Sequence, residues 1–300
     1  MRQRIFTLRQ IIETGTARLE EAGVGEAALD AWYLLEYCTG ISRAAYYGEP
    51  DRPLEEALAE QYMEYISMRG RRIPLQHITG EQEFMGYSFC VNEHVLIPRQ
   101  DTETLAEEAL KILRAKGSGT RVLDMCTGSG CILLSLLKYS NECEGIGIDI
   151  SAEALEKAQE NAQRLDIDAV FLAGDLFEPL ADFVSERTSD RLFDMIVSNP
   201  PYIETAVIDT LMPEVREHEP FGALDGGEDG LQFYRRIVAQ APAHLRRGAV
   251  LLFEIGCGQG EAVLQLMQEA DFAEVKVLQD YAGLDRVVYG IKSGSVEMKQ

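Results

Sequence analysis

Several features that would direct a sequence to a particular class of protein are missing from these 300 residues. No apolar run approaches the roughly 20 residues that span a membrane, and the N-terminus (MRQRI) lacks the apolar core of a signal peptide. Basic residues are few, since 28 Lys and Arg stand against 50 Asp and Glu for a net charge of −22. Proteins that bind duplexes usually present a basic surface to the phosphates. We therefore expect neither membrane association nor stable nucleic-acid binding.

The cysteines also lack a recognisable pattern. None of the six belongs to a C-x-x-C pair, and a chain with 46% hydrophobic residues can form a sizeable core without disulfides. We expect reduced thiols and a cytoplasmic protein. Cys126 and Cys131 flank a glycine-rich loop, but no histidine stands near them, and the four histidines show no metal-ligand or triad spacing. No metal is expected.

The N-terminal quarter of the chain shows helical periodicity and no catalytic constellation. Apolar residues recur at helical spacing through residues 4–70. We predict a small helical domain over residues 1–75 that serves as a packed accessory or substrate-docking domain. Strand-like alternation then predicts a β-hairpin linker over residues 76–98. A catalytic domain over residues 99–293 and a frayed tail over residues 294–300 complete the predicted organisation.

Beyond the linker, short apolar runs alternate with amphipathic stretches, which is typical of an α/β fold. Asp101 is expected to cap the first helix, over residues 102–113. The strand-like runs are apolar on both faces, so they predict a mostly parallel sheet covered by helices on both sides. The predicted strands comprise residues 121–123, 145–148, 170–172, 195–197 and 250–253, with two closing strands near residues 274 and 288.

Polar side chains stand where four of these strands end. Asp124, Asp149, Asp175 and Asn199 each lie at or just after the carboxyl end of a strand-like run. Parallel strands end at the same edge of a sheet, and ligands of such folds bind beyond that edge. The four side chains are therefore expected along one rim of a binding site.

A glycine-rich loop, with the sequence DMCTGSG, covers residues 124–130. Gly128 and Gly130 would let a ligand approach the backbone closely at the start of the next helix. A nicotinamide fingerprint needs glycine or alanine where this chain has Leu133. The loop therefore suits an adenosine-containing methyl donor better than a nicotinamide dinucleotide.

Acidic residues on the rim indicate which ligand this is. Asp149 is placed to accept hydrogen bonds from ribose hydroxyls. Asp175 with Leu176 either flanks an adenine ring or caps a helix. A positively charged sulfonium suits a rim of carboxylates, whereas a pyrophosphate does not. These residues predict S-adenosyl-L-methionine as the cofactor.

The sequence Asn199-Pro200-Pro201-Tyr202 follows the fourth strand-like run. An amide or aromatic amine nitrogen is a poor nucleophile, and acceptors on its N–H groups stabilise the charge that develops on alkylation. The Asn199 side chain and the Pro200 carbonyl are such acceptors, the prolines fix the turn in advance, and Tyr202 offers a flat face. The element predicts an N-methyltransferase site, with a simple strand-ending turn as the alternative.

Together these motifs resemble the bacterial peptide chain release factor glutamine methyltransferases (the HemK/PrmC family) over nearly the whole chain. The resemblance is carried by Gly80–Phe84, Leu96–Arg99, Asp101–Glu103, Asp124–Gly130, Asn199–Tyr202, Glu219–Pro220, Ala223–Leu224, Gly226–Gly227, Asp229–Leu231, Glu254–Gly256, Gly283 and Asp285–Arg286. The family implies a Rossmann-like class I S-adenosylmethionine-dependent methyltransferase domain with a seven-stranded sheet. It also implies N5-methylation of the glutamine in the Gly-Gly-Gln motif of release factors, its partners in translation termination, with S-adenosyl-L-homocysteine as product.

The resemblance, together with the polar side chains at the strand ends, implies roles for individual residues. Asn199, Pro200 and Tyr202 would be catalytic, and Asn199–Tyr202 would hold the substrate glutamine. The predicted donor contacts are Phe84, Arg99, Asp124, Cys126, Thr127, Gly128, Ser129, Gly130, Asp149, Asp175, Leu176 and Asn199. Gln100 and Cys126 depart locally from the family's usual proline and glycine.

Other functions remain open at this point. A DNA or RNA base N-methyltransferase would use the same Asn-Pro-Pro-Tyr chemistry on a flipped base, although the net charge of −22 disfavours it. A non-catalytic donor-binding scaffold would have no use for Asn199–Tyr202. A nicotinamide oxidoreductase would not account for Leu133 in the glycine-rich loop or for Asn199–Tyr202.

Overall fold

The computed structural model describes residues 6–140, 142–181, 183 and 192–293, so the tail predicted over residues 294–300 lies outside the described residues. The chain divides into two compact units. The first, here called the helical unit, consists of Met1–Glu81 and Met212–His218. The second, here called the sheet unit, consists of Gln82–Leu211 and Glu219–Gln300.

The helical unit is a bundle with its own apolar core, as the periodicity predicts. Its helices are α1 (Leu8–Glu21), α2 (Ala27–Thr39), α3 (Arg43–Gly48), α4 (Glu56–Gly70), α5 (Leu75–Thr79) and α10 (Pro213–Arg216). A capping box begins α1, since Thr7 accepts the Gln10 N–H and the Gln10 side chain accepts the Thr7 N–H. Trp32, Tyr62 and Ile66 are buried in the core between the helices.

Ion pairs join α10 to α4 and to the turn that follows α4, within the helical unit. Arg69 lies 2.7 Å from Asp30 and 2.9 Å from Glu214. Arg72 donates to both Glu214 oxygens, at 2.7 and 2.6 Å. Burial alone would raise the pKa of Glu214, but hydrogen bonds and the two guanidinium groups lower it to about 2. This cluster brings together residues that are 145 positions apart in the sequence.

The expected hairpin is present, formed by β1 (Glu81–Phe84) and β2 (Tyr87–Cys90). Its two-residue turn places Met85 and Gly86 at φ 51° and 76°, as the twist of a tight hairpin requires. The Met85 N–H donates to the Glu103 carboxylate at 2.6 Å, which offsets part of the cost of a left-handed methionine.

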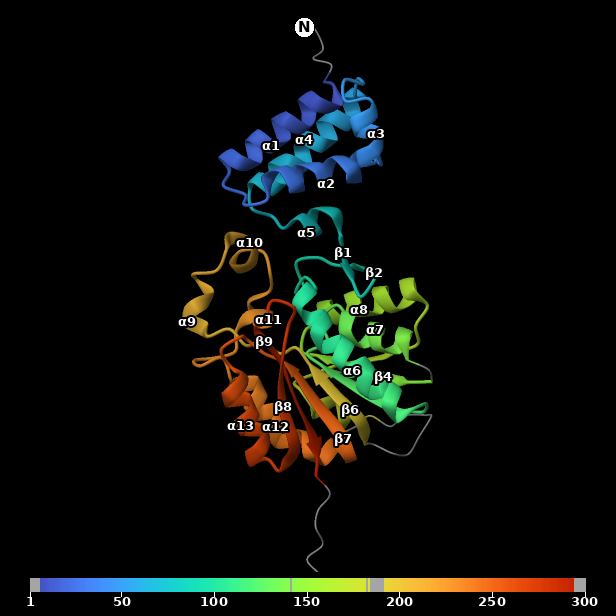
Figure 1. Cartoon of the computed structure of the whole chain (residues 1–300), viewed down its shortest axis with the longest axis vertical. Coiled ribbons are helices and arrows are strands. Elements are labelled where there is room, and N and C mark those ends of the chain that lie inside the picture. Colours follow the sequence, from blue (N-terminus) through green and yellow to red (C-terminus); the bar gives the residue numbers. More distant parts are fainter. Residues whose placement is uncertain (1–5, 141, 182, 184–191, 294–300) are drawn as a thin grey trace, which may run out of the picture. The chain divides into compact units, whose positions relative to one another are not determined.

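Seven strands form one sheet in the part of the chain that the structure describes (Figure 1). They are β3 (Arg121–Met125), β4 (Glu144–Asp149), β5 (Val170–Ala173), β6 (Phe193–Ser198), β7 (Leu245–Glu254), β8 (Phe272–Gln279) and β9 (Asp285–Lys292). Their order is β5-β4-β3-β6-β7-β9-β8. The first five in this order run parallel, and β9 is antiparallel to both β7 and β8. The prediction of a mostly parallel seven-stranded sheet is confirmed.

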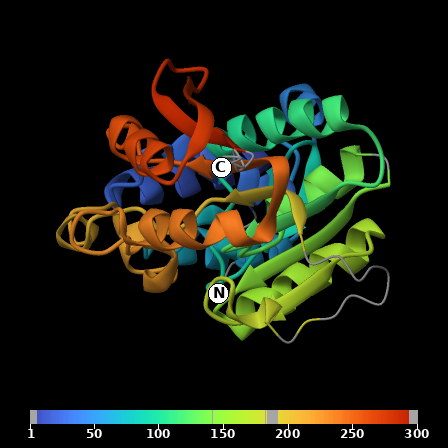
Figure 2. The same cartoon turned by 90° about the horizontal axis from the view of Figure 1, so that it is seen from below.

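Helices cover both faces of this sheet (Figures 1 and 2). On one face lie α6 (Glu103–Lys116), α7 (Cys131–Tyr139) and α8 (Ala152–Leu165), and on the other α12 (Gln232–His244) and α13 (Gly260–Glu269). Because strand side chains alternate between faces, Val122 packs in one core and Leu123 in the other. Shorter elements are η1 (Gln100–Thr102), η2 (Glu178–Leu180), α9 (Thr205–Ile208) and α11 (Phe221–Leu224).

One local prediction is wrong. Asp101 does not cap α6, because the chain enters that helix through the 3₁₀ turn η1 and the N-cap position is Thr102. The Asp101 carboxylate instead lies 3.2 Å from the Arg286 guanidinium. Among the described residues, no helix combines the length and the apolar character that crossing a membrane requires.

Candidate active site

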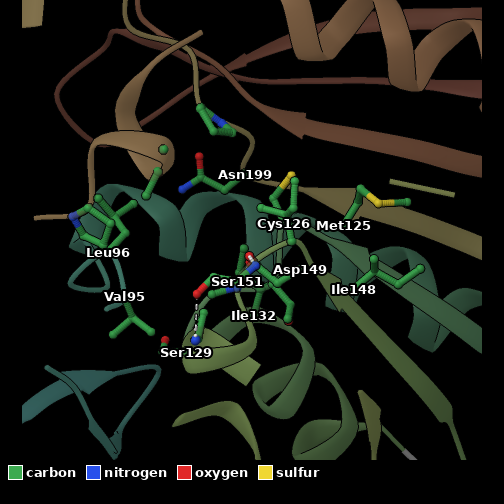
Figure 3. A pocket seen from close by; sticks show the side chains of 18 of the residues that line it. Val95, Leu96, Met125, Cys126, Ser129, Ile132, Ile148, Asp149, Ser151 and Asn199 are labelled. Atoms are coloured by element: carbon green, nitrogen blue, oxygen red, sulfur yellow. Dashed lines mark hydrogen bonds between the residues drawn. The ribbon is translucent and has the colours of Figure 1, made fainter. Parts of the chain in front are cut away.

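The carboxyl ends of the parallel strands open into a cavity of about 300 Å³ within the sheet unit. Its lining includes the loop between β3 and α7, the ends of β4 to β6 and the segment of residues 94–99 (Figure 3). Further lining residues are Thr102, Ser151, Ala154, Pro220, Gly222, Ala223, Phe233 and Arg236. The strand order places Asp175, Asp149, Asp124 and Asn199 successively along the rim. The structure thus places all four residues at one edge of the sheet, and three of them, Asp149, Asp175 and Asn199, line the cavity.

Asp149 ends β4 and faces the cavity (Figure 3). One of its oxygens accepts the Gly128 N–H at 2.8 Å, and the other accepts the Ser151 N–H at 3.0 Å. Burial raises the pKa of this carboxyl, and these backbone hydrogen bonds oppose the rise. An ionised carboxylate has about four acceptor positions. Asp149 can therefore hold the glycine-rich loop and still accept from a ligand.

Asp124 is fully buried beneath the glycine-rich loop and does not line the cavity. It accepts from the Thr127 hydroxyl at 2.6 Å and from the Leu133 N–H at 3.3 Å. Burial raises the pKa of Asp124 to about 7. Gly130 is also structural, because its φ is 77° and an added Cβ would lie 3.2 Å from the Ala158 Cβ. Both residues therefore shape the loop, and we assign neither of them a ligand contact.

The remaining loop residues predicted for the donor do line the cavity, namely Cys126, Thr127, Gly128 and Ser129. Cys126 has φ 61°, a left-handed conformation that costs an L-residue about 1–2 kcal/mol. A glycine, the residue usual in the resembling family, adopts this conformation without that cost. Burial raises the pKa of the Cys126 thiol, so the thiol is neutral at physiological pH.

Asp175 and Leu176 line the cavity just beyond β5. The Asp175 carboxylate pairs with Arg236 at 2.7 Å. Asp175 does not cap the nearby 3₁₀ helix η2, whose N-cap position is Phe177. Leu176 is almost fully buried and, like Cys126, has a left-handed backbone, at φ 52°. Two strained residues at one cavity indicate that its shape is imposed by the surrounding structure.

Two other predicted donor contacts, Arg99 and Phe84, differ in whether they reach the cavity. Arg99 lines the cavity and donates to both oxygens of Glu219 at 2.6 Å. Burial raises the pKa of Glu219, and the Arg99 guanidinium opposes that rise. Phe84 does not line the cavity, because its side chain is fully buried in the core below the hairpin, edge-to-face with Phe89. We assign Phe84 a packing role.

Asn199 follows β6 directly, and its side chain faces the same cavity as Asp149 (Figure 3). The Asn199 Nδ2 donates to the Thr102 hydroxyl oxygen at 3.4 Å. This contact occupies the donor end of the amide and leaves Oδ1 free to accept. Pro201 also lines the cavity, whereas Pro200 and Tyr202 are not among its lining residues.

Tyr202 is held from several directions behind the cavity wall. Its hydroxyl donates to Glu254 at 3.3 Å, and its carbonyl accepts from the Gln259 side chain at 2.9 Å. A Cβ added at Gly226 would lie 2.7 Å from the Tyr202 Cα. A Cβ added at Gly230 would lie 2.4 Å from the Tyr202 carbonyl oxygen. Burial raises the pKa of Tyr202. Tyr202 therefore fixes the turn through its backbone and hydroxyl.

Sequence reasoning assigned no role to the residues that support the acceptor element. Thr102, Gly226, Gly230 and Glu254 stand in motifs that carry the family resemblance, and that resemblance was the only signal that pointed to them. Gln259 lies three residues after one of these motifs. The described residues contain no group of three or more His, Cys, Asp or Glu that could hold a metal ion.

The cavity and its rim define a methyltransferase, and comparison with known proteins agrees. A family model described as "Methyltransferase domain" matches residues 116–234, and one described as "PrmC N-terminal domain" matches residues 10–80. The solved 16S rRNA N2 G1207 methyltransferase of T. thermophilus shares the fold at a TM-score of 0.50 and 19% identity, covering 71% of this chain and 49% of that one.

Curated relatives identify the family. The chain is 43% identical over 286 residues to the release factor glutamine methyltransferase of Geobacter sulfurreducens, covering 95% of this chain and 97% of that protein. It is 41% identical over 278 residues to the protein of that name from Caulobacter vibrioides, covering 92% and 93%. The chain belongs to the release factor glutamine methyltransferase family.

Proposed function

We propose that this protein transfers a methyl group from S-adenosyl-L-methionine to the side-chain nitrogen of the glutamine in the Gly-Gly-Gln motif of peptide chain release factors. The observation that carries the proposal is the orientation of Asn199, whose amide faces the cavity with its oxygen free, on the same rim as Asp149. Relatives that span most of the chain are named for this activity.

The cavity suits this donor. Asp149 would accept from the ribose hydroxyls, and Asp175 and Leu176 would flank the adenine. The loop residues Cys126–Ser129 would border the rest of the donor, with Arg99 at its edge. The volume of about 300 Å³ is at the lower end of small-ligand sites. The bound donor supplies a methyl group activated by a positively charged sulfur.

Asn199 would activate the acceptor amide. Its Oδ1 would accept one of the amide's N–H groups, which helps to aim the nitrogen lone pair at the methyl carbon, and Pro200 would fix the turn that positions Asn199. The new N–C bond forms as the C–S bond breaks, and the electron pair of that bond stays on sulfur. The extra proton on nitrogen then leaves to water. Tyr202 holds the turn, so that little ordering remains during the reaction.

We also propose that the helical N-terminal domain, residues 1–75, docks the release factor, that residues 76–98 link it to the catalytic domain, and that the protein acts in the cytoplasm without stable nucleic-acid binding. Every residue assigned to the donor or the acceptor lies in the sheet unit. The helical unit is therefore available for recognition of the protein substrate.

A methyl-transfer assay on three substrates tests the function: a release factor, adenine-rich DNA and ribosomal RNA. Incorporation should occur into the release factor and be lost when its Gly-Gly-Gln glutamine is changed to asparagine. Asn199→Ala should lower the rate by about 10²- to 10³-fold, the usual cost of losing one preorganised partner of a developing charge. Affinity for S-adenosyl-L-homocysteine, measured by calorimetry, should fall much less. Incorporation into nucleic acid alone would overturn the proposal.

A further inference from the structure

An ion pair lies at the end of the cavity that is proposed to hold the adenine of the donor. Asp175 follows β5, Arg236 lies on α12, and both residues line the cavity. The Arg236 Nη2 donates to Asp175 Oδ2 at 2.7 Å. The side chains of Arg236 and Asp175 are 37% and 34% exposed. An ion pair this accessible to water contributes little to stability, so the pair is of interest for what it does at the cavity.

The backbone on either side of Asp175 is fixed by contacts within the protein. The Gly174 N–H donates to the Asp149 carbonyl at 3.0 Å, which ties this turn to the residue proposed to hold the ribose. A Cβ added at Gly174 would lie 2.4 Å from the Pro179 Cγ, so the two segments are in close contact. Leu176 follows with a left-handed φ of 52°. The turn therefore sets the position of the Asp175 Cα, and only rotation of its side chain is left to be determined.

Arg236 restricts that rotation and leaves part of the carboxylate available. Its guanidinium engages Oδ2, and none of the described residues donates a hydrogen bond to Oδ1. An ionised carboxylate accepts several hydrogen bonds and donates none. A carboxylate that is already held in one direction also loses less freedom when a ligand binds. Asp175 therefore offers an oriented acceptor at this end of the cavity.

The base of the proposed donor has one group that matches this acceptor. Adenine carries a hydrogen-bond donor, its 6-amino group, beside ring nitrogens that only accept. Because a carboxylate oxygen only accepts, Asp175 Oδ1 can pair with the base only through that amino group. Leu176, which is proposed to contact the adenine, is the next residue in the chain, so the edge of the base comes within reach of Asp175.

We propose that Arg236 is a positioning residue that holds the Asp175 carboxylate toward the 6-amino group of the donor's adenine, and that it thereby strengthens the selection of an adenine base. This inference deepens the proposed function and rests on it, because it concerns the same donor. Arg236 acts through Asp175 and makes no contact with the base itself.

Calorimetry on the whole protein tests this with two ligands, S-adenosyl-L-homocysteine and its deamino analogue, which has hydrogen in place of the 6-amino group. The dissociation constant of the analogue divided by that of S-adenosyl-L-homocysteine isolates the contribution of the amino group from any general loss of affinity. Arg236→Met removes the guanidinium and keeps an unbranched apolar stem. Arg235→Met is the matched control, because Arg235 is the preceding residue of α12, pairs with Asp229 and does not line the cavity.

The wild type should bind S-adenosyl-L-homocysteine about 10- to 100-fold more tightly than the analogue, the usual value of one hydrogen bond to a charged group. Asp175→Ala should bring this ratio close to one. Arg236→Met should lower the ratio at least about threefold, as expected for two side chains in contact, and Arg235→Met should leave it unchanged. In a protein that already carries Asp175→Ala, Arg236→Met should have no further effect on the ratio, because the residue on which it acts is absent.

A wild-type ratio near one would overturn the inference, as would a folded Arg236→Met protein that keeps the wild-type ratio. A further fall of the ratio when Arg236→Met is added to Asp175→Ala would also overturn it, since Arg236 would then contact the base directly. Arg236→Gln replaces the methionine variant if that variant does not fold.

The ratio is measured without an acceptor, so it does not depend on which protein is methylated. A wild-type protein that binds S-adenosyl-L-homocysteine but methylates no release factor refutes the proposed substrate alone, and the measured ratios still decide the role of Arg236. A wild-type protein that does not bind S-adenosyl-L-homocysteine overturns both.

Discussion

Replacing Gly226 by alanine should damage catalysis more than stability, because this glycine makes room for the backbone of the acceptor element. An added Cβ would lie 2.7 Å from the Tyr202 Cα and 2.9 Å from the Gly230 Cα. Real Cβ atoms essentially never approach other atoms within 3.0 Å, so the backbone must move by roughly 0.5–1 Å. A displacement near 1 Å at a reacting site costs about 10²-fold. We therefore expect kcat to fall by about 10- to 100-fold.

The cost in stability should be modest. Overpacking typically costs about 1–3 kcal/mol, and alanine recovers about 0.4–1 kcal/mol by restricting the unfolded chain. Gly226 is not in the left-handed region, so no conformational penalty is added. The net loss in the free energy of unfolding should lie between about 0 and 2.6 kcal/mol.

Three other glycines separate the contributions. Gly258→Ala meets open space and has no left-handed φ, so neither kcat nor stability should fall. Gly248 has φ 75° and also faces open space, so its substitution should cost about 1 kcal/mol of stability and no activity. Gly230 combines φ 69° with a 2.4 Å approach to the Tyr202 carbonyl oxygen and should show both losses.

Urea denaturation and steady-state methyl transfer measure the two quantities. The expected pattern is loss of kcat for the Gly226 and Gly230 variants alone. A Gly226→Ala protein that folds and keeps full kcat would contradict this prediction, as would a Gly248 variant that loses as much activity as the Gly226 variant.

Two further predictions concern charged groups. Asp149→Ala should weaken binding of S-adenosyl-L-homocysteine in calorimetry by about 10- to 100-fold, since hydrogen bonds to a charged group are worth about 1.5–3 kcal/mol; an unchanged dissociation constant would remove Asp149 from the site. Glu214 has its pKa lowered from 4.5 to about 2, so its contribution is complete above about pH 4.5 and is lost as the pH falls toward 2. The wild type should be more stable than Glu214→Gln, and this difference should shrink in that pH window. Unfolding can be followed through the fluorescence of the single tryptophan, Trp32. Glu217→Gln, at an exposed site, is the control, and a stability difference that stays constant with pH would contradict the prediction.

The sheet and its rim could be predicted because their signals are local. A strand buried on both faces must be apolar along a short run, and residues 195–197 are such a run within β6. The residue after that strand is then placed by the topology of parallel sheets, which puts Asn199 on the rim. Family motifs added the chemistry of the acceptor.

Which way a rim side chain points could not be predicted. Asp124 and Asp149 both stand at strand ends, yet Asp124 turns beneath the loop while Asp149 faces the cavity. The difference depends on the Thr127 hydroxyl and the Leu133 N–H, which approach Asp124 only after the loop has folded. Asp101 was misassigned for a similar reason, because its partner Arg286 comes from a distant strand.

The discontinuity of the helical unit has a consequence for synthesis of the chain. Residues 1–81 leave the ribosome before Glu214 is made. At that stage Arg69 has Asp30 as a partner, but neither Arg69 nor Arg72 yet has Glu214. The ion-pair cluster can close only after Met212–His218 has been added, when β3 to β6 are already made. The helical unit can therefore begin to fold first, but it cannot complete its ion pairs until Met212–His218 has been made. A fragment that stops after the hairpin would keep both guanidinium groups without their shared carboxylate.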